Sequence, residues 1–380
     1  MSEHPAPAYL DPRSGRTWPI EQPRWCSDSG APLLLTDLPG IEPRQIDARL
    51  RSLWRYQAAL PLPCARPISM GEGCTPLIEH QRHGRQVLLK CEWFMPTGSF
   101  KDRGASVMLS LLREQGVSAV LEDSSGNGGA AVAAYAAAGD MHATIMTPAS
   151  TSPAKTVAMR ACGASLELIP GSRQATADAA VRRSSEIFYA SHNWQPFFLQ
   201  GTKTLAYELW EDLGFEVPDN IIVPCGAGSN VLGCDIGFRE LQRCGQIDRL
   251  PRLFAAQPAN CGPIAAAFLA GREVVERSVA PTIAEGTAIA EPVRLPEVLA
   301  ALRRSDGGAV LLEEAEIAAA TLSLARAGIY VEPTSAQVAA AFDRLIEQGV
   351  IETGQRTVLV LTGTGIKSTQ RVAELLGVEL

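Results

Sequence analysis

The sequence predicts an α/β protein in which helices cover mostly parallel sheets. From Val87 onward, short apolar runs alternate with helical patterns, as expected for parallel strands joined by right-handed helical crossovers. The last apolar run, Thr357–Leu361, is continuous and rich in β-branched residues, which is typical of a strand buried on both faces. At 380 residues the chain is longer than one typical domain, so we expect two lobes.

The predicted elements follow in chain order. Residues 1–65 are rich in proline, contain one amphipathic helical stretch at 46–56, and are predicted to form an N-terminal arm. We expect strands at 87–90, 119–122, 144–146, 166–169, 221–224 and 357–361. We expect helices at 101–115, 128–138, 153–162, 175–189, 202–213 and 232–244.

The composition favours small-molecule partners. The formal net charge of −7 disfavours nucleic acid and anionic membranes, because those partners require clustered Lys and Arg. No apolar segment approaches the ~20 residues needed to cross a bilayer, and no secretory pattern follows Met1, so we expect a cytoplasmic protein. The nine cysteines include no CxxC pair, and we predict reduced thiols and no metal site.

A lysine at a loop-to-helix junction is the first chemical feature. Lys101 follows the turn at 96–100 and opens a predicted helix. Its ordinary interpretation is a surface residue at the start of a helix, where the helix dipole is mildly unfavourable for a cation. In a cleft, the same dipole and the loss of water lower the pKa of the amine, which a Schiff-base lysine needs. Taken alone, the segment leaves both interpretations open.

A glycine-rich loop is the second feature. Gly226, Ala227, Gly228, Ser229 and Asn230 follow an apolar strand and precede a predicted helix. Because glycines lack Cβ atoms, consecutive backbone N–H groups can approach a phosphate there, and the helix N-terminus adds its positive end. The loop has neither the Lys-Ser/Thr of a Walker loop nor the GxGxxG dinucleotide pattern. It indicates a phosphate without a nucleotide, and a plain glycine-rich connection is the alternative.

A third segment joins the strand predicted at 119–122 to the next helix. It contains Ser124, Ser125, Gly126, Asn127 and Gly128. The amide of Asn127 can donate a hydrogen bond to a phenolic or carboxylate oxygen. Asparagine is also a common helix N-cap, and the two roles are compatible.

Four segments, in this order, together resemble threonine synthase, a pyridoxal 5′-phosphate (PLP) enzyme of fold type II. They are Gly71–Leu77, Pro96–Gly104 (PTGSFKDRG), Leu199–Thr204 and Leu361–Lys367. The resemblance covers roughly residues 70 to 370 and implies two lobes, each a mostly parallel sheet flanked by helices. It implies a large PLP-binding lobe from 66–112 and 205–380, a small mobile lobe from 113–204, and an arm from 1–65 packed on the large lobe. A homodimer is also implied.

The resemblance implies roles for individual residues. Lys101 is the implied catalytic residue, which holds PLP as a Schiff base and then acts as general base and acid. The implied cofactor-binding residues are Lys101, Asn127, Gly226, Ala227, Gly228, Ser229, Asn230 and Thr362. Asn127 would bind the 3′-oxygen, the glycine loop the phosphate, and Thr362 the pyridine nitrogen. A neutral hydroxyl at that nitrogen favours elimination over transamination. The substrate carboxylate would be held by Ser124, Ser125 and Gly126.

The sequence departs from threonine synthase where that family binds the phosphate of O-phosphohomoserine. Phe198 occupies the position of an arginine, His192 and Asn193 stand where asparagine and serine are found, and Gly128 replaces a hydroxyl residue. An aromatic ring cannot neutralise a dianion, and losing a bidentate arginine contact costs on the order of a few kcal/mol. We therefore expect Gly128, Asn193 and Phe198 to contact a small amino-acid substrate with a less charged leaving group.

Several activities stay open at this stage. We expect elimination or replacement at the β- or γ-carbon of the substrate. Threonine synthase proper is the main alternative, with Arg173, Arg182 or Lys203 as the ligand of the substrate phosphate. The segment 284–288 resembles threonine dehydratases, so a serine or threonine ammonia-lyase is a further alternative, as is a cysteate synthase-like enzyme. Outside enzymes, the alternative is an inactive PLP-fold binding module.

Overall fold

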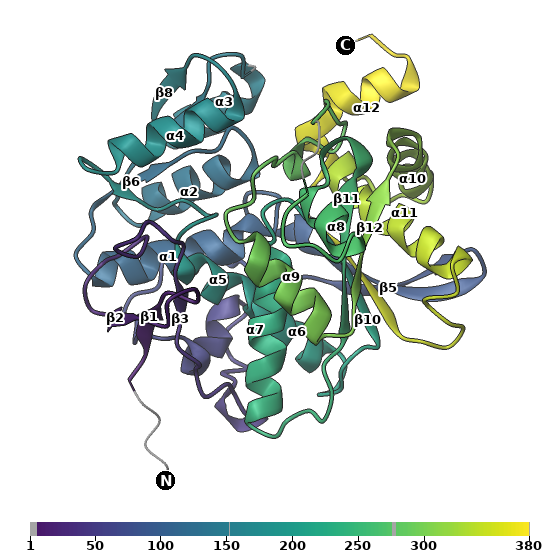
Figure 1. Cartoon of the computed structure of the whole chain (residues 1–380), viewed down its shortest axis with the longest axis horizontal. Coiled ribbons are helices and arrows are strands. Elements are labelled where there is room, and N and C mark those ends of the chain that lie inside the picture. Colours follow the sequence, from purple (N-terminus) through teal and green to yellow (C-terminus); the bar gives the residue numbers. More distant parts are fainter. Residues whose placement is uncertain (1–5, 152, 276–278, 380) are drawn as a thin grey trace. The chain divides into compact units, whose positions relative to one another are not determined.

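The structure, a computed structural model, describes residues 6–151, 153–275 and 279–379 (Figure 1). Its residues group into two compact units. Unit 1 comprises residues 1–74, 101–204 and 243–246, and unit 2 comprises residues 75–100, 205–242 and 247–380. The predicted lobes share the break at residue 204, but the structure groups the arm and residues 66–74, 101–112 and 243–246 with unit 1.

Packing explains why the arm and residues 101–112 belong to unit 1. Helix α1 (Lys101–Glu114) packs on two other helices of this unit, α2 (Asn127–Ala138) and α5 (Pro196–Thr202). Tyr9 and Trp54 of the arm are buried in the same apolar cluster as residues of these helices. The apolar face of α1 is therefore covered by unit 1 itself.

Unit 2 is built on a six-stranded sheet with the strand order β12-β11-β10-β13-β5-β4. The strands are β4 (Leu77–Arg82), β5 (Arg85–Cys91), β10 (Asn220–Pro224), β11 (Arg252–Pro258), β12 (Gly308–Leu312) and β13 (Thr357–Leu361). All neighbouring strands are parallel except the β4–β5 hairpin. Its two loop residues, His83 and Gly84, both have positive φ, as a type I′ turn requires. The mostly parallel sheet confirms the predicted α/β class.

Helices cover the sheet of unit 2. They are α6 (Thr204–Asp212), α7 (Ser229–Arg243), α8 (Pro263–Leu269), α9 (Leu295–Arg304), α10 (Glu314–Arg326), α11 (Pro333–Glu347) and α12 (Thr369–Leu376). Helix α11 packs on four strands, and its buried Val338 and Phe342 share an apolar cluster with Ile222 and Leu359 of the sheet. Helices α8 and α9 pack on β11 and β12. Every residue of β13 is buried, as its apolar pattern predicts.

Unit 1 contains a smaller parallel sheet and a three-stranded antiparallel sheet in the arm. The parallel sheet has the order β8-β7-β6-β9, with β6 (Ala119–Glu122), β7 (His142–Pro148), β8 (Ser165–Ile169) and β9 (Phe188–Tyr189). The arm sheet is formed by β1 (Ala8–Leu10), β2 (Thr17–Pro19) and β3 (Leu34–Leu35). Helix α2 packs on β6 and β7 and contacts α3 (Pro153–Ala161), whereas α4 (Arg173–Arg183) packs on β7, β8 and β9 through a separate apolar cluster that contains Leu121 and Met146.

Three predicted helices differ from the structure. The stretch 46–56 is not one helix, because short 3-10 helices at Pro43–Gln45 and Leu53–Ala59 replace it. The helix predicted at 175–189 ends at Arg183, and its last two residues form β9, which gains backbone hydrogen bonds by pairing with β6. The helix predicted at 202–213 is divided into α5 and α6 at Lys203. In the described ranges, no helix is long and apolar enough to cross a membrane.

Candidate active site

Lys101 is the first residue of α1 and directly follows a turn that is anchored to the end of β13. In that turn, the Phe100 N–H donates to the Thr362 carbonyl at 2.9 Å, and Ser99 forms a bridge with Gly363. Gly98 has φ +78°, and a Cβ atom there would lie 2.9 Å from Cγ2 of Thr364. A larger residue at 98 would therefore disturb the turn.

The other described lysines are engaged in structural contacts or exposed. Lys90 is buried, donates to the Thr75 carbonyl at 2.8 Å, and pairs with Glu208 at 2.7 Å. Lys203 is buried and donates to the Ala59 carbonyl at 2.8 Å, and Lys367 is exposed. By contrast, Nζ of Lys101 lies 5.5 Å from the centroid of the Phe198 ring, within cation–π range. Of the described lysines, Lys101 is thus the one beside the Phe198 ring.

The segment after β6 brings several predicted substrate residues together. Ser124 is buried, and its Oγ accepts the Gly126 N–H at 3.4 Å. Helix α2 begins at Asn127, and the N-cap is Gly126. The predicted alternative of Asn127 as the N-cap is therefore wrong, because the helix starts one residue earlier than an asparagine cap requires.

His192 and Phe198 lie beside this segment. Nδ1 of His192 is 2.8 Å from Oε1 of Glu122, and the two rings of His192 and Phe198 have centroids 5.7 Å apart. A Cβ atom on Gly128 would lie 2.8 Å from Cε1 and Nδ1 of His192, so the imidazole occupies the space that a side chain at 128 would need. The three departures Gly128, His192 and Phe198 thus form one cluster with Lys101.

The structure shows the surroundings of the three cationic residues that the sequence offers as alternative ligands of a substrate phosphate. Arg173 pairs with Asp123 at 2.8 Å, and the same carboxylate accepts from Tyr189 and Ser191. Arg182 is exposed on α4, and Lys203 is buried with its ammonium on a backbone carbonyl. Asn193, which is half-buried, donates its backbone N–H to Ser191 Oγ at 3.4 Å.

In unit 2, the glycine loop connects β10 to the N-terminus of α7. Gly228 has φ +92°, and a Cβ atom there would lie 2.3 Å from Cγ2 of Val298. A Cβ atom on Gly226 would lie 3.2 Å from the Gly286 carbonyl, so the 284–288 segment packs against this loop. Asn230 is buried at the start of α7, and its Nδ2 has no hydrogen-bond partner among the described residues. A donor without a partner at a glycine-rich helix N-terminus fits the phosphate of PLP.

The end of β13 presents a buried hydroxyl pair. Oγ1 of Thr362 is 3.2 Å from Oγ of Ser335, which also accepts the Gly363 N–H at 2.8 Å. The nearby Ser99 Oγ is buried and has no partner among the described residues. Ser335 was not predicted from the sequence, since Pro333 marks only the start of a helix there. Neutral hydroxyls at this strand end fit the pyridine ring that Thr362 is predicted to face.

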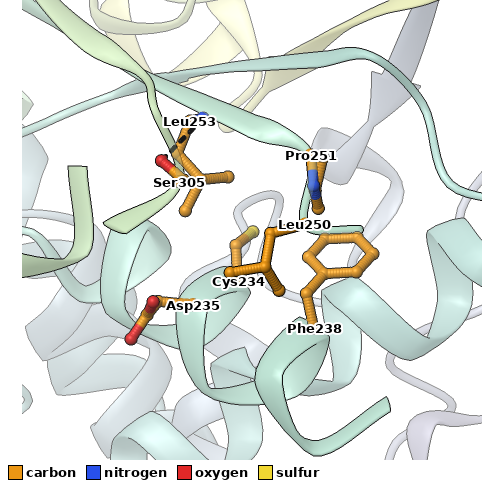
Figure 2. A pocket seen from close by; sticks show the side chains of 7 residues that line it. All are labelled: Cys234, Asp235, Phe238, Leu250, Pro251, Leu253 and Ser305. Carbon is orange, nitrogen blue, oxygen red and sulfur yellow. Dashed lines mark hydrogen bonds between the residues drawn. The ribbon is translucent and has the colours of Figure 1, made fainter. Parts of the chain in front are cut away.

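Figure 2 shows a pocket elsewhere in unit 2. It is lined by Cys234, Asp235, Phe238, Leu250, Pro251, Leu253 and Ser305. Its empty volume of about 160 Å³ includes space open to solvent. Asp235 is bound by Arg304 at 2.9 Å through two nitrogens. The pocket contains none of the predicted site residues, and we assign it no ligand.

Comparisons with known proteins identify the class of enzyme. The sequence matches the family described as pyridoxal-phosphate dependent enzyme over residues 68–363. It is 32% identical over 370 residues to threonine synthase of Methanocaldococcus jannaschii, covering 93% of this chain and 91% of that protein. It is 34% identical over 345 residues to threonine synthase of Methanosarcina acetivorans, covering 88% and 85%. A fungal L-serine ammonia-lyase from Rhizomucor miehei has the same fold, with a TM-score of 0.70 at 22% identity over 80% of this chain and 98% of that one.

The chain therefore belongs to the PLP-dependent enzymes, and its architecture is fold type II. Within this class it is a threonine synthase-like lyase or synthase that uses PLP as its cofactor. The predicted family, fold class and cofactor are confirmed.

Proposed function

We propose that this enzyme catalyses elimination or replacement at the β- or γ-carbon of a small amino acid whose leaving group carries little charge. The observation that carries the proposal is the cluster of Phe198, His192 and Gly128 beside Lys101. It offers an aromatic wall and an imidazole instead of a cationic group for a phosphate. The proposal extends the assignment to the threonine synthase-like PLP enzymes with a narrower class of substrates.

The proposed cofactor residues keep the roles that the sequence predicts. Lys101 would hold PLP as a Schiff base, Asn127 would bind its 3′-oxygen, and residues 226–230 would bind its phosphate. Thr362, supported by Ser335, would face the pyridine nitrogen with a neutral hydroxyl. When bound, PLP supplies an electron sink for bonds at the substrate α-carbon. Lys101, once released from the cofactor, would take the α-proton and return it.

The substrate carboxylate would lie at the start of α2. Ser124 and Ser125 offer hydroxyls there, and Gly126 offers a backbone N–H at the N-cap. A helix N-terminus favours an anion, and two hydroxyl donors add direct hydrogen bonds. The side chain of the substrate would then extend toward Phe198, with Gly128 and Asn193 beside it.

Electrostatics disfavours a phosphate at that end of the substrate. Glu122, the last residue of β6, and Asp123 are both buried, and the guanidinium of Arg173 is paired with Asp123 at 2.8 Å. Phe198 is fully buried and has no donor to offer. A dianion would lose its water without gaining charge-assisted hydrogen bonds, which is costly. A hydroxyl or another neutral group avoids that cost.

Two observations favour alternative reactions. The threonine synthases of two archaeal species are more than 30% identical to this chain, which favours threonine synthase proper. The 284–288 segment, which resembles threonine dehydratases, packs against the glycine loop, and the Gly286 N–H donates to Thr334 Oγ1 at 3.0 Å. That placement favours a serine or threonine ammonia-lyase.

Steady-state kinetics of the holoenzyme separate these reactions. L-Serine, L-threonine, O-phosphoserine and O-phosphohomoserine are compared for keto acid, phosphate and amino-acid products. We expect O-phosphohomoserine to be a poor substrate and a neutral hydroxy amino acid to be better. A kcat/KM for threonine formation from O-phosphohomoserine near ~10⁴ M⁻¹s⁻¹ or above, the range of natural substrates, would refute the proposal. Light scattering tests the homodimer that the family resemblance implies.

A further inference from the structure

The side chains of Glu122 and His192 form a buried pair in unit 1. Nδ1 of His192 is 2.8 Å from Oε1 of Glu122, and the backbone N–H of His192 donates to Oε2 at 3.0 Å. Because an ionised carboxylate only accepts hydrogen bonds, both oxygens of Glu122 are used and Nδ1 carries the proton. In the neutral ring, Nε2 therefore carries the lone pair.

The imidazole is fixed beside Lys101. Its ring and Nζ of Lys101 contact the same Phe198 ring, at centroid distances of 5.7 and 5.5 Å. Gly128 leaves the space that the imidazole fills. Among the described residues, no hydrogen bond to Nε2 of His192 is found, although its side chain is only 9% exposed. One nitrogen of the ring is thus oriented by a carboxylate, and the other is available to a ligand.

We propose that His192, oriented by Glu122, is a second acid–base residue that contacts the β-oxygen of a β-hydroxy amino acid; this rests on the proposed function. In elimination, the Cβ–O bond breaks and its electron pair goes to the oxygen, which takes the proton from Nε2 of the protonated ring and leaves as water. The Cα–H electron pair forms the new double bond, and the α-proton goes to Lys101. Glu122 acts as a positioning residue that also stabilises the protonated ring.

His192 can also act as a base when water adds to Cβ of the unsaturated intermediate, which is the reverse of the elimination step. The water oxygen bonds to Cβ while neutral Nε2 takes one of its protons, and the double-bond pair takes a proton from Lys101 at Cα. One imidazole therefore handles the oxygen-bound proton and one lysine handles the carbon-bound proton. A separate acid for the oxygen is needed when hydroxide is the leaving group, because hydroxide leaves poorly unless it is protonated, whereas a phosphate leaves without a proton.

The charged groups around the ring set its resting state. Burial and then the charge of Lys101 lower the pKa of His192, whereas Glu122 and Asp123 raise it. The charge of Arg173 is balanced by Asp123. The resting ring is neutral and accepts a hydrogen bond from the substrate hydroxyl through Nε2. Before elimination, Nε2 takes up a proton from water, with the carboxylate of Glu122 stabilising the protonated ring, and that proton then goes to the departing oxygen.

Binding of two unreactive amino acids to the holoenzyme tests the contact apart from turnover. α-Methyl-L-serine and 2-aminoisobutyrate both lack an α-proton and differ by one hydroxyl group. We expect α-methyl-L-serine to bind about 5- to 10-fold more tightly, as one neutral hydrogen bond contributes, measured from the change in cofactor absorbance. In His192→Leu/Glu122→Gln, which leaves no unpaired buried charge, the preference should disappear.

A matched control and a second measurement complete the test. His142, on β7 of the same unit, is exposed and bonded to Ser165 Oγ, so His142→Gln should keep the preference. In Glu122→Gln alone, ¹⁵N NMR of the His192 imidazole should show a lower pKa and a changed tautomer ratio. An unchanged hydroxyl preference in the double variant overturns the contact at His192. If no amino acid changes the absorbance of the wild-type enzyme, the proposed function fails as well.

Discussion

Substituting Gly128 by alanine tests the cluster beside Lys101 through stability alone. The new Cβ atom would lie 2.8 Å from Cε1 and Nδ1 of His192 and 3.0 Å from Oγ of Ser124. The imidazole must move away, which lengthens its 2.8 Å hydrogen bond to Glu122. A hydrogen bond to a charged group contributes about 1.5–3 kcal/mol. Alanine returns up to about 1 kcal/mol of helix propensity in α2.

The two effects leave a net loss of about 0.5–2 kcal/mol in the free energy of unfolding, because the lost charged hydrogen bond exceeds the gain in helix propensity. Urea unfolding of the apo-protein measures it. The control is Gly128→Ala in a His192→Ala background, where the obstructing ring is absent and alanine should be neutral or stabilising. If Gly128→Ala costs the same with and without the His192 ring, the two residues are not in contact and the cluster is wrongly described.

The remaining predictions concern the cofactor and the pH dependence of stability. Borohydride reduction of the holoenzyme should attach PLP to Lys101, and Lys101→Ala should abolish the attachment; a labelled Lys203 would contradict the assignment. Gly228→Asp should lose PLP affinity, whereas Gly228→Ala, which meets Val298 in the same way but adds no charge, should lose less of it, as absorbance titration shows. Thr362→Asp should increase transamination by-products, because the pyridine nitrogen gains a charged partner, and unchanged product ratios would argue against that role. The pKa of His192 is lowered by burial and then by the charge of Lys101, so the unfolded chain binds this proton more readily than the folded protein does. The free energy of unfolding should therefore fall as the pH drops below about 6.5 toward the lowered pKa. His192→Gln should remove this component, and an identical pH dependence of the free energy of unfolding in the two proteins would contradict it.

The strands that are buried on both faces could be predicted from the sequence because their patterns are local. The strand at 119–122 and the strand at 357–361 have the predicted bounds. Phe188–Tyr189 could not be predicted, because this two-residue strand exists only through pairing with β6. The helix predicted over those residues had the right periodicity as far as Arg183. Tertiary hydrogen bonds overrode local propensity after that point.

The site was predictable to the extent that it lies in contiguous motifs. Lys101 and the 226–230 loop stand at the junctions where the sequence places them. Glu122 lies 70 residues before His192 in the chain, and Ser335 lies 27 residues before Thr362. Neither partner belongs to a recognisable motif. Such contacts depend on which strand ends and helix starts the fold brings together, and a single sequence does not contain that information.

The residues that depart from the threonine synthase pattern pack against one another, so a substitution at one of them affects the others. A Cβ atom on Gly104 would lie 2.4 Å from Cε2 and Cζ of Phe198, so Gly104 makes room for the phenyl ring as Gly128 makes room for His192. Replacing Phe198 by arginine would bury a guanidinium next to the ammonium of Lys101, and both oxygens of Glu122 already accept hydrogen bonds from His192. A cationic binding site for a substrate phosphate therefore requires substitutions at several positions together, because the phenyl ring and the imidazole occupy the space that the two glycines leave open.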